Sequence, residues 1–264
     1  MRIVFVGCGF LGKAAADLFN SPDNRILAIT KAPDCEKINT APHPPQIFTT
    51  CRCDITAPFA PLEYWTSPDL LIFCPGTRGG DASAYRSLYL DGFRKTLDAY
   101  HPLHTIFISS TSVYGDHHGA WVDEDTSPRP LDKRGEILLA AESLACTVLR
   151  LAGIYSAERS AYLRRYLDGS ARIFHQRWVN QIHRDDAARA IFFAAEKKLQ
   201  GLFNVCDEHP LTQHDIYAIL AKKFGKPLPP CDKEIPKRPP ANKRISCAKL
   251  RSLGWSPKFP VYTP

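Results

Sequence analysis

Six residues near the start of the chain, Gly7-Cys8-Gly9-Phe10-Leu11-Gly12, have the spacing G-x-G-x-x-G. This spacing is a weak signal by itself, so its context decides its meaning. The short apolar run 3–6 comes directly before it and is typical of a buried parallel strand. A helix-like pattern over 12–20 follows. A glycine turn between a strand and a helix indicates a site that binds a dinucleotide.

Each glycine of this turn has a separate task in such a site. Gly7 allows the tight turn, Gly9 lets a pyrophosphate approach the backbone, and Gly12 allows close packing of helix on strand. The backbone N–H groups of Phe10 and Leu11 lie at the start of the helix, where the dipole favours an anion. The alternative is an ordinary glycine turn that binds nothing.

The end of the second predicted strand bears on the choice between NAD and NADP. An acidic residue at this place would bind the ribose 2′-hydroxyl of NAD. This chain has Thr30 and Lys31 there, and its next carboxylate is Asp34. A hydroxyl followed by a cation suits a 2′-phosphate, so we expect NADP rather than NAD. Lys31 as a solvated loop residue is the alternative.

The elements that position these residues alternate between strand and helix through the first half of the chain. Apolar runs predict strands at 3–6, 25–30, 47–50, 70–74, 105–109 and 146–151, and amphipathic patterns predict helices at 12–20, 83–100 and 135–144. Repeated strand–helix units imply an α/β fold with a doubly wound parallel sheet, a Rossmann fold. We expect one domain over 1–264, with a small C-terminal substrate lobe built mainly from about 152–181 and 206–264.

Composition narrows the class further. The chain has 264 residues, 44% of them hydrophobic and 23% charged, which is ordinary for a globular protein. We see no signal peptide and no apolar run of the ~20 residues that a membrane span needs. We therefore expect a cytoplasmic protein with a small-molecule substrate, no membrane and no nucleic acid partner; a homodimer is a candidate assembly.

The charge distribution and the cysteines give no indication of a nucleic-acid site, disulfides or a metal site. The net charge of +7 is concentrated late, and six prolines interrupt 227–240, which favours a pocket mouth or a solvated surface over a nucleic-acid stripe. The nine cysteines are scattered and read as free thiols. Cys51 and Cys53, with Cys35 and His43 upstream, match no common zinc spacing, so we expect no metal.

Beyond the glycine turn, the chain resembles the extended and atypical short-chain dehydrogenase/reductases, the NAD(P)-dependent sugar-nucleotide epimerase/dehydratase superfamily. The matching segments are Cys53-Asp54-Ile55, Cys74-Pro75-Gly76, Ser109-Ser110-Thr111-Ser112-Val113-Tyr114-Gly115, Leu149-Arg150-Leu151-Ala152-Gly153-Ile154-Tyr155, Asn180–Ala187 and Phe203-Asn204-Val205. The resemblance implies that Asp54 meets the adenine amine and that Pro75 and Gly76 lie beside the cofactor.

The chain departs from this family at the catalytic pair. The family transfers protons with a serine or threonine and a Tyr-x-x-x-Lys pair, and no Tyr-x-x-x-Lys occurs in this sequence. Alignment of the motifs places Ser110 at the catalytic serine, Arg134 at the tyrosine and Leu138 at the lysine. Arg134 cannot act as a base, but it could bind a carboxylate or phosphate of the substrate. Tyr89 falls where many members carry an asparagine near the nicotinamide.

Other side chains near the predicted strand ends could in principle act as acids or ligands. Tyr85, Tyr114, Tyr155 and His183 are expected to be packing or capping residues, and the pair His117-His118 lies in a loop beside the expected site.

Two functions from different classes follow. The first is an NAD(P)-dependent oxidoreductase or epimerase-like enzyme acting by hydride transfer on a small polar, sugar- or nucleotide-linked substrate, with Ser110 orienting the reacting oxygen. The alternative is a non-catalytic NADP-binding sensor or regulatory protein. The missing Tyr-x-x-x-Lys favours the sensor, whereas the retained Ser110 favours the enzyme.

Overall fold

The computed structural model describes residues 1–31, 48–77, 79–174, 177–232 and 241–263. The chain divides into two compact units. The first contains 1–110, 132–149 and 188–202, and the second contains 111–131, 150–187 and 203–264. Each unit is described by itself below.

A seven-stranded parallel sheet has the order β12-β7-β5-β4-β1-β2-β3, and the first unit contains β1 to β5 complete together with the first residues of β7 and β12. The strands of this sheet are β1 (Arg2–Val6), β2 (Arg25–Thr30), β3 (Phe48–Arg52), β4 (Leu70–Phe73), β5 (Thr105–Ser110), β7 (Thr147–Leu151) and β12 (Gly201–Val205). In register, Ile3 pairs with Ile26 of β2 on one side and Leu70 of β4 on the other. β2 and β3 therefore lie on one side of β1, and β4, β5, β7 and β12 lie on the other. The strand order reverses beside β1, and such sheets bind ligands at this point.

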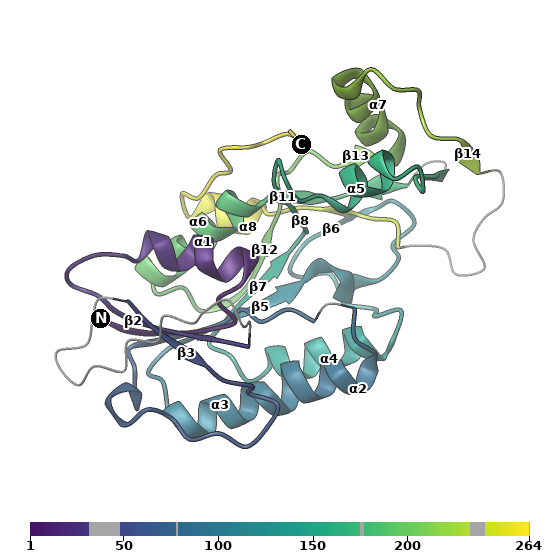
Figure 1. The fold of residues 1–264 in the computed structure, drawn as a ribbon. Coiled ribbons are helices and arrows are strands. Elements are labelled where there is room, and N and C mark those ends of the chain that lie inside the picture. The colour runs from purple at the N-terminus through teal and green to yellow at the C-terminus, as the bar shows by residue number, and fades with distance from the viewer. Residues whose placement is uncertain (32–47, 78, 175–176, 233–240, 264) are drawn as a thin grey trace. The chain divides into compact units, whose positions relative to one another are not determined.

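Helices cover both faces of this sheet (Figure 1). One face carries α1 (Phe10–Leu18) and α6 (Arg184–Glu196), and the other carries α2 (Ala82–Tyr85), the π-helical segment η2 (Arg86–Gly92), α3 (Phe93–Tyr100) and α4 (Lys133–Glu142). A short 3₁₀ turn, η1 (Glu63–Trp65), precedes β4. The predicted doubly wound α/β fold is confirmed.

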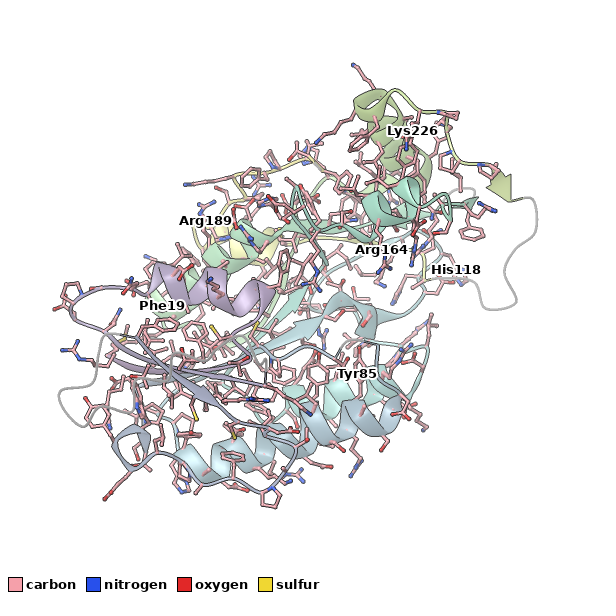
Figure 2. The ribbon with its side chains drawn as sticks, viewed as in Figure 1. Phe19, Tyr85, His118, Arg164, Arg189 and Lys226 are labelled. Carbon is pink, nitrogen blue, oxygen red and sulfur yellow. The ribbon has the colours of Figure 1, made fainter. Side chains whose placement is uncertain are left out.

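Aromatic side chains hold the helices on the sheet. Phe19, at the end of α1, packs with ring centroids 5.6 Å from Phe5 of β1 and 4.9 Å from Phe192 of α6. On the opposite face Phe93 lies 4.6 Å from Phe73 and 5.0 Å from Phe107. Figure 2 labels Phe19 in the α1 layer and Tyr85 in the layer of α2.

The second unit contains α5 (Ala161–Leu167), α7 (Gln213–Phe224) and α8 (Ala248–Ser252), the 3₁₀ turn η3 (Thr111–Tyr114) and four strand pairs. The pairs are β8 (Gly153–Tyr155) with β11 (Gln181–His183), β10 (Trp178–Val179) with β13 (Leu211–Thr212), β9 (Ile173–Phe174) with β14 (Cys231–Asp232), and β6 (Trp121–Val122) with β15 (Arg244–Ile245). Its core is rich in tyrosine: Tyr155, Tyr162, Tyr166, Tyr217 and Tyr262 are all buried there. This unit holds the residues of the expected substrate lobe and also 111–131, and its role in binding substrate stays a prediction.

In the part of the chain that the structure describes, no helix has the length and apolar character required to span a membrane.

Candidate functional site

Two of the three glycines in the turn after β1 are required by close packing. Gly7 has a φ of +92°, and a Cβ there would lie 2.4 Å from Pro75 Cα. A Cβ on Gly12 would lie 2.3 Å from the carbonyl oxygen of Gly7. These contacts bring the start of α1 against both the turn and the end of β4. Gly7 and Gly12 therefore shape the site.

Gly9 differs because a Cβ there would meet no atom within 4 Å. Gly9 is also the N-cap of α1, which has no side-chain cap hydrogen bond and no acidic residue in its first turn. The N–H groups at a helix start, among them those of Phe10 and Leu11, favour an anion where no carboxylate competes. Gly76, after β4, likewise has nothing within 4 Å of its Cβ position. The open space over Gly9 thus fits a pyrophosphate.

The residues expected to bind the adenosine end lie together at the ends of β2 and β3. Thr30 is buried, and its carbonyl oxygen accepts a hydrogen bond from Cys53 N at 3.0 Å. Lys31 Nζ lies 2.6 Å from Asp54 Oδ2, although 76% of the lysine side chain is exposed. Asp54 also accepts hydrogen bonds from the N–H and the hydroxyl of Thr56. The hydrogen bond from Lys31, followed by those from Thr56, lowers the pKa of Asp54 to about 2.

Tyr89 lies within η2 and is nearly buried. Its hydroxyl donates a hydrogen bond to the carbonyl oxygen of Pro75 at 3.2 Å, and its ring packs 5.1 Å from that of Tyr85. Burial, and after it the neighbouring Tyr85, raises the pKa of Tyr89 to about 12. Tyr89 is therefore a neutral phenol at physiological pH, and this contact positions Pro75 and Gly76. A π-helical segment is uncommon and is frequently found at functional sites.

Ser110 is the half-buried last residue of β5. Its neighbour Ser109 donates a hydrogen bond to Glu142 Oε1 at 2.5 Å, and both side chains are buried. This bond ties the end of β5 to the end of α4. Glu142 was not among the site residues predicted from the sequence. Its buried position could have been predicted, because Glu142 lies on the same face of the helix as the apolar residues Leu138 and Ala141.

Arg134 lies in the first turn of α4, and 45% of its side chain is exposed. Its guanidinium donates to Asp132 Oδ2 from Nη2 at 2.7 Å and from Nε at 3.1 Å, and its Cζ lies 5.7 Å from the centre of the Tyr85 ring. Asp132 is also the N-cap of α4 and accepts from the N–H groups of Arg134 and Gly135. Leu138, at the position of the family's lysine, is buried.

The remaining candidates all lie in the second unit and make structural contacts. The Tyr114 hydroxyl donates to Asn204 Oδ1 at 3.0 Å, and the Tyr155 hydroxyl donates to the carbonyl oxygen of Val261 at 3.2 Å. The His183 ring lies 3.9 Å from that of Phe259, and its Nδ1 accepts from the N–H of Asp185.

Among the described residues no group of three or more His, Cys, Asp or Glu could hold a metal ion. Cys51 and Cys53 are free thiols, and burial raises the pKa of each. Cys35 and His43, together with Asp34, lie outside the described residues.

A Rossmann sheet with an open glycine turn at its switch point defines a dinucleotide-binding protein of the short-chain dehydrogenase/reductase type. Residues 3–137 match the model of the NAD dependent epimerase/dehydratase family, and the chain belongs to that family. This confirms the predicted resemblance and the predicted class, a nicotinamide-dependent enzyme family.

Individual proteins are also similar to this chain in sequence or in fold. Protein YeeZ of Escherichia coli strain K12 is 28% identical over 167 residues, and the match spans 59% of this chain and 59% of YeeZ. A Methylobacillus flagellatus protein, named as an NAD-dependent epimerase/dehydratase, is 29% identical with a TM-score of 0.75, covering 99% of this chain and 94% of that one. UDP-glucuronic acid 4-epimerase from Bacillus cereus, solved with NAD, shares the fold at 20% identity and a TM-score of 0.78, covering 98% of this chain and 94% of that one.

Proposed function

We propose that this protein is an NAD(P)-dependent oxidoreductase or epimerase that acts by hydride transfer on a small polar substrate, sugar-linked or nucleotide-linked. The observation that carries the proposal is the open space over Gly9 at the uncapped start of α1. A nicotinamide dinucleotide supplies the hydride acceptor or donor when bound. The family to which the chain belongs and its NAD-bound structural neighbour support this choice.

The first unit holds the residues that would bind the cofactor. The N–H groups of Phe10 and Leu11 would bind the diphosphate, because Gly9 leaves the approach to them open. Pro75 and Gly76 would lie beside the nicotinamide half. Tyr89 would keep that loop in place through its hydrogen bond to the Pro75 carbonyl.

The same unit holds the residues that would act on the substrate. Ser110 would orient the reacting oxygen, and the buried Ser109–Glu142 hydrogen bond fixes the end of the strand that carries it. Arg134 would bind an anionic group of the substrate, since a guanidinium is protonated at any working pH. Such an anion would compete with Asp132, its present partner.

We propose NADP as the preferred cofactor. Lys31 lies directly after β2 with an exposed side chain, where a 2′-phosphate would accept a charge-assisted hydrogen bond. The ion pair between Lys31 and Asp54 sets the size of this preference, because the phosphate must either share Lys31 with the Asp54 carboxylate or displace that carboxylate from it.

A second candidate is a non-catalytic NADP-binding sensor of the same fold. The observation that favours it is the state of two groups, Arg134 at the position of the family's tyrosine and Tyr89 at the position where many members carry an asparagine. Arg134 is held by its own helix cap, and Tyr89 is a buried phenol with a pKa of about 12. Neither group could accept a proton from a substrate hydroxyl near neutral pH.

Two measurements on the full chain separate these functions. Titration with NADPH and NADH, followed by cofactor fluorescence, tests binding; no binding of either would overturn both candidates. Incubation of the NADP⁺-loaded protein with a panel of nucleoside-diphosphate sugars and simple sugar phosphates, followed by absorbance of the reduced nicotinamide and by product analysis, tests turnover. Reduction or epimer formation that disappears in Ser110→Ala supports the enzyme. Tight binding with no chemistry across the panel would favour the sensor.

A further inference from the structure

Three segments of the second unit meet around Asn242. The N–H of His117 donates to the Asn242 carbonyl oxygen at 3.0 Å, and the N–H of Trp178 donates to Asn242 Oδ1 at 2.9 Å. The N–H of Asn242 in turn donates to Asp116 Oδ1 at 2.9 Å. These bonds bring the loop after η3, the start of β10 and the start of β15 to one place. Each segment also carries a basic residue: His117, Arg177 and Lys243.

Lys243 is the most buried of these basic groups, with 6% of the residue exposed. Its Nζ donates to the carbonyl oxygen of Gly115 at 2.9 Å, which is one hydrogen bond to the described residues for a group that has three donors. Burial, and after it repulsion from Arg177, lowers the pKa of Lys243 to about 8. A lysine at this position is costly for the folded protein unless something else compensates its charge.

Two further nitrogens of the cluster are buried and lack partners. Arg177 Nε and His117 Nε2 have no hydrogen-bond partner among the residues that the structure describes. Buried polar atoms are almost always paired in native proteins, so two such nitrogens on the segments that Asn242 joins to the buried Lys243 point to a missing acceptor. A single bound anion has several acceptor lone pairs, so it could accept hydrogen bonds from Lys243, Arg177 and His117 together.

Charge balance within the cluster supports the same conclusion. Among the described residues Asp116 supplies a carboxylate to the cluster. Its Oδ1 already accepts from the N–H groups of Asn242 and His118, and its Oδ2 lies 3.3 Å from His118 Nδ1. Burial pushes the pKa of Asp116 upward, yet these hydrogen bonds hold it below its usual range. Its charge is therefore largely engaged. Counted over the described residues, Lys243 and Arg177 give the cluster an excess of positive charge.

We propose that Lys243, Arg177 and His117 form an anion-binding site that takes a phosphate or carboxylate group of the substrate. The assignment to a substrate rests on the proposed function. The anion binding itself does not, because all three residues belong to the second unit and the candidate cofactor residues belong to the first.

The probes that test this site are inorganic phosphate and acetate, titrated calorimetrically into the full chain. The Gly9→Val background keeps phosphate from the glycine turn. Phosphate or acetate should bind, and Lys243→Met should weaken binding at least about tenfold, the loss expected for a charge-assisted contact. Lys222→Met is the matched control, because Lys222 lies exposed on α7 of the same unit. Preference for phosphate would assign a phosphorylated substrate, and preference for acetate a carboxylated one.

Two outcomes would overturn the proposal: no binding of either probe, or equal affinity in Lys243→Met and its parent. Because Lys243 is buried, a second measurement is needed that does not depend on the variant folding. The pKa of Lys243, followed by NMR of its Cε, should rise when the bound anion is present. A pKa that does not change as phosphate saturates the protein would also overturn it. Failure of NADPH binding, in contrast, would remove the proposed function and leave the anion site standing.

Discussion

Lys31 and Asp54 form an ion pair of 2.6 Å between the ends of β2 and β3. The family resemblance gave these residues separate tasks, one at the 2′-phosphate and the other at the adenine amine. In the structure each of the two side chains is instead the ion-pair partner of the other. Cofactor choice therefore depends on the balance within this pair, because Asp54 neutralises the cation that a 2′-phosphate would need.

Freeing Lys31 should strengthen the preference for NADPH. Asp54→Asn removes the competing carboxylate, so NADPH should bind more tightly relative to NADH. Lys31→Ala should remove most of the difference, about tenfold or more for a charge-assisted contact of roughly 1.5–3 kcal/mol. Fluorescence titration of both cofactors in the three proteins measures this. Equal affinity for NADPH and NADH in the unmutated protein would rule the idea out.

The glycine turn gives the sharpest test of the cofactor site. Gly9→Val places a branched side chain in open space, so the fold should survive while the pyrophosphate loses its place. Calorimetry should show no binding of NADPH or NADH, and thermal unfolding should be close to that of the parent. Unchanged cofactor affinity would mean that the dinucleotide binds elsewhere.

Gly12→Ala is the structural counterpart of that variant. Its Cβ would lie 2.3 Å from the carbonyl oxygen of Gly7, so the start of α1 must move. Forcing an atom into a packed site costs about 1–3 kcal/mol, and the free energy of unfolding measured in denaturant should fall by that amount. A Gly12→Ala protein as stable as the parent would show that the turn is looser than described.

The sequence predicted the sheet well because each buried strand is a short apolar run followed by a turn. The runs predicted at 3–6, 25–30, 70–74 and 105–109 correspond to β1, β2, β4 and β5, and no boundary differs by more than one residue. The helix expected over 83–100 is present from residue 82, but its middle is π-helical. Hydrophobic spacing alone does not show the extra residue per turn.

The ion pairs and buried polar contacts of the site were beyond sequence reasoning because they join residues far apart in the chain. Lys31 follows β2 and Asp54 follows β3, and Glu142 at the end of α4 accepts from Ser109 of β5. Their pairing depends on the register of β2 with β3 and on the seating of α4. The motif positions identified which segments meet, but not which side chains satisfy one another.

Arg134 is predicted to bind the substrate rather than the cofactor. Arg134→Ala should weaken binding of an anionic substrate about tenfold or more and leave NADPH affinity within twofold, as expected for loss of one charge-assisted contact. Lys133→Ala is the matched control, because Lys133 is exposed on the same helix turn and pairs with Glu136. Substrate affinity that falls equally in both variants would reduce the effect to general surface charge.

Asp207 should make the stability of the protein fall as pH rises. The residue is 1% exposed, its Oδ2 is buried without a partner among the described residues, and its Oδ1 accepts from the N–H of His209. Burial, with Asp186 and Glu208 nearby, raises the pKa of Asp207 to about 8. The folded state thus keeps a proton that the unfolded state releases near pH 4, its ordinary range.

The sign of the effect follows from this difference in bound protons. Between about pH 4 and pH 8 the folded protein binds more protons than the unfolded one, so stability decreases by at most about 1.4 kcal/mol per pH unit from this group. Asp207→Asn removes the titration while keeping an oxygen for His209, so its stability should depend less on pH and exceed that of the parent at high pH. Asp125→Asn, at an exposed carboxylate of the same unit, should leave the slope unchanged. Urea unfolding midpoints across this range measure the slope, and parallel profiles for parent and Asp207→Asn would show that Asp207 is already ionised in the folded protein.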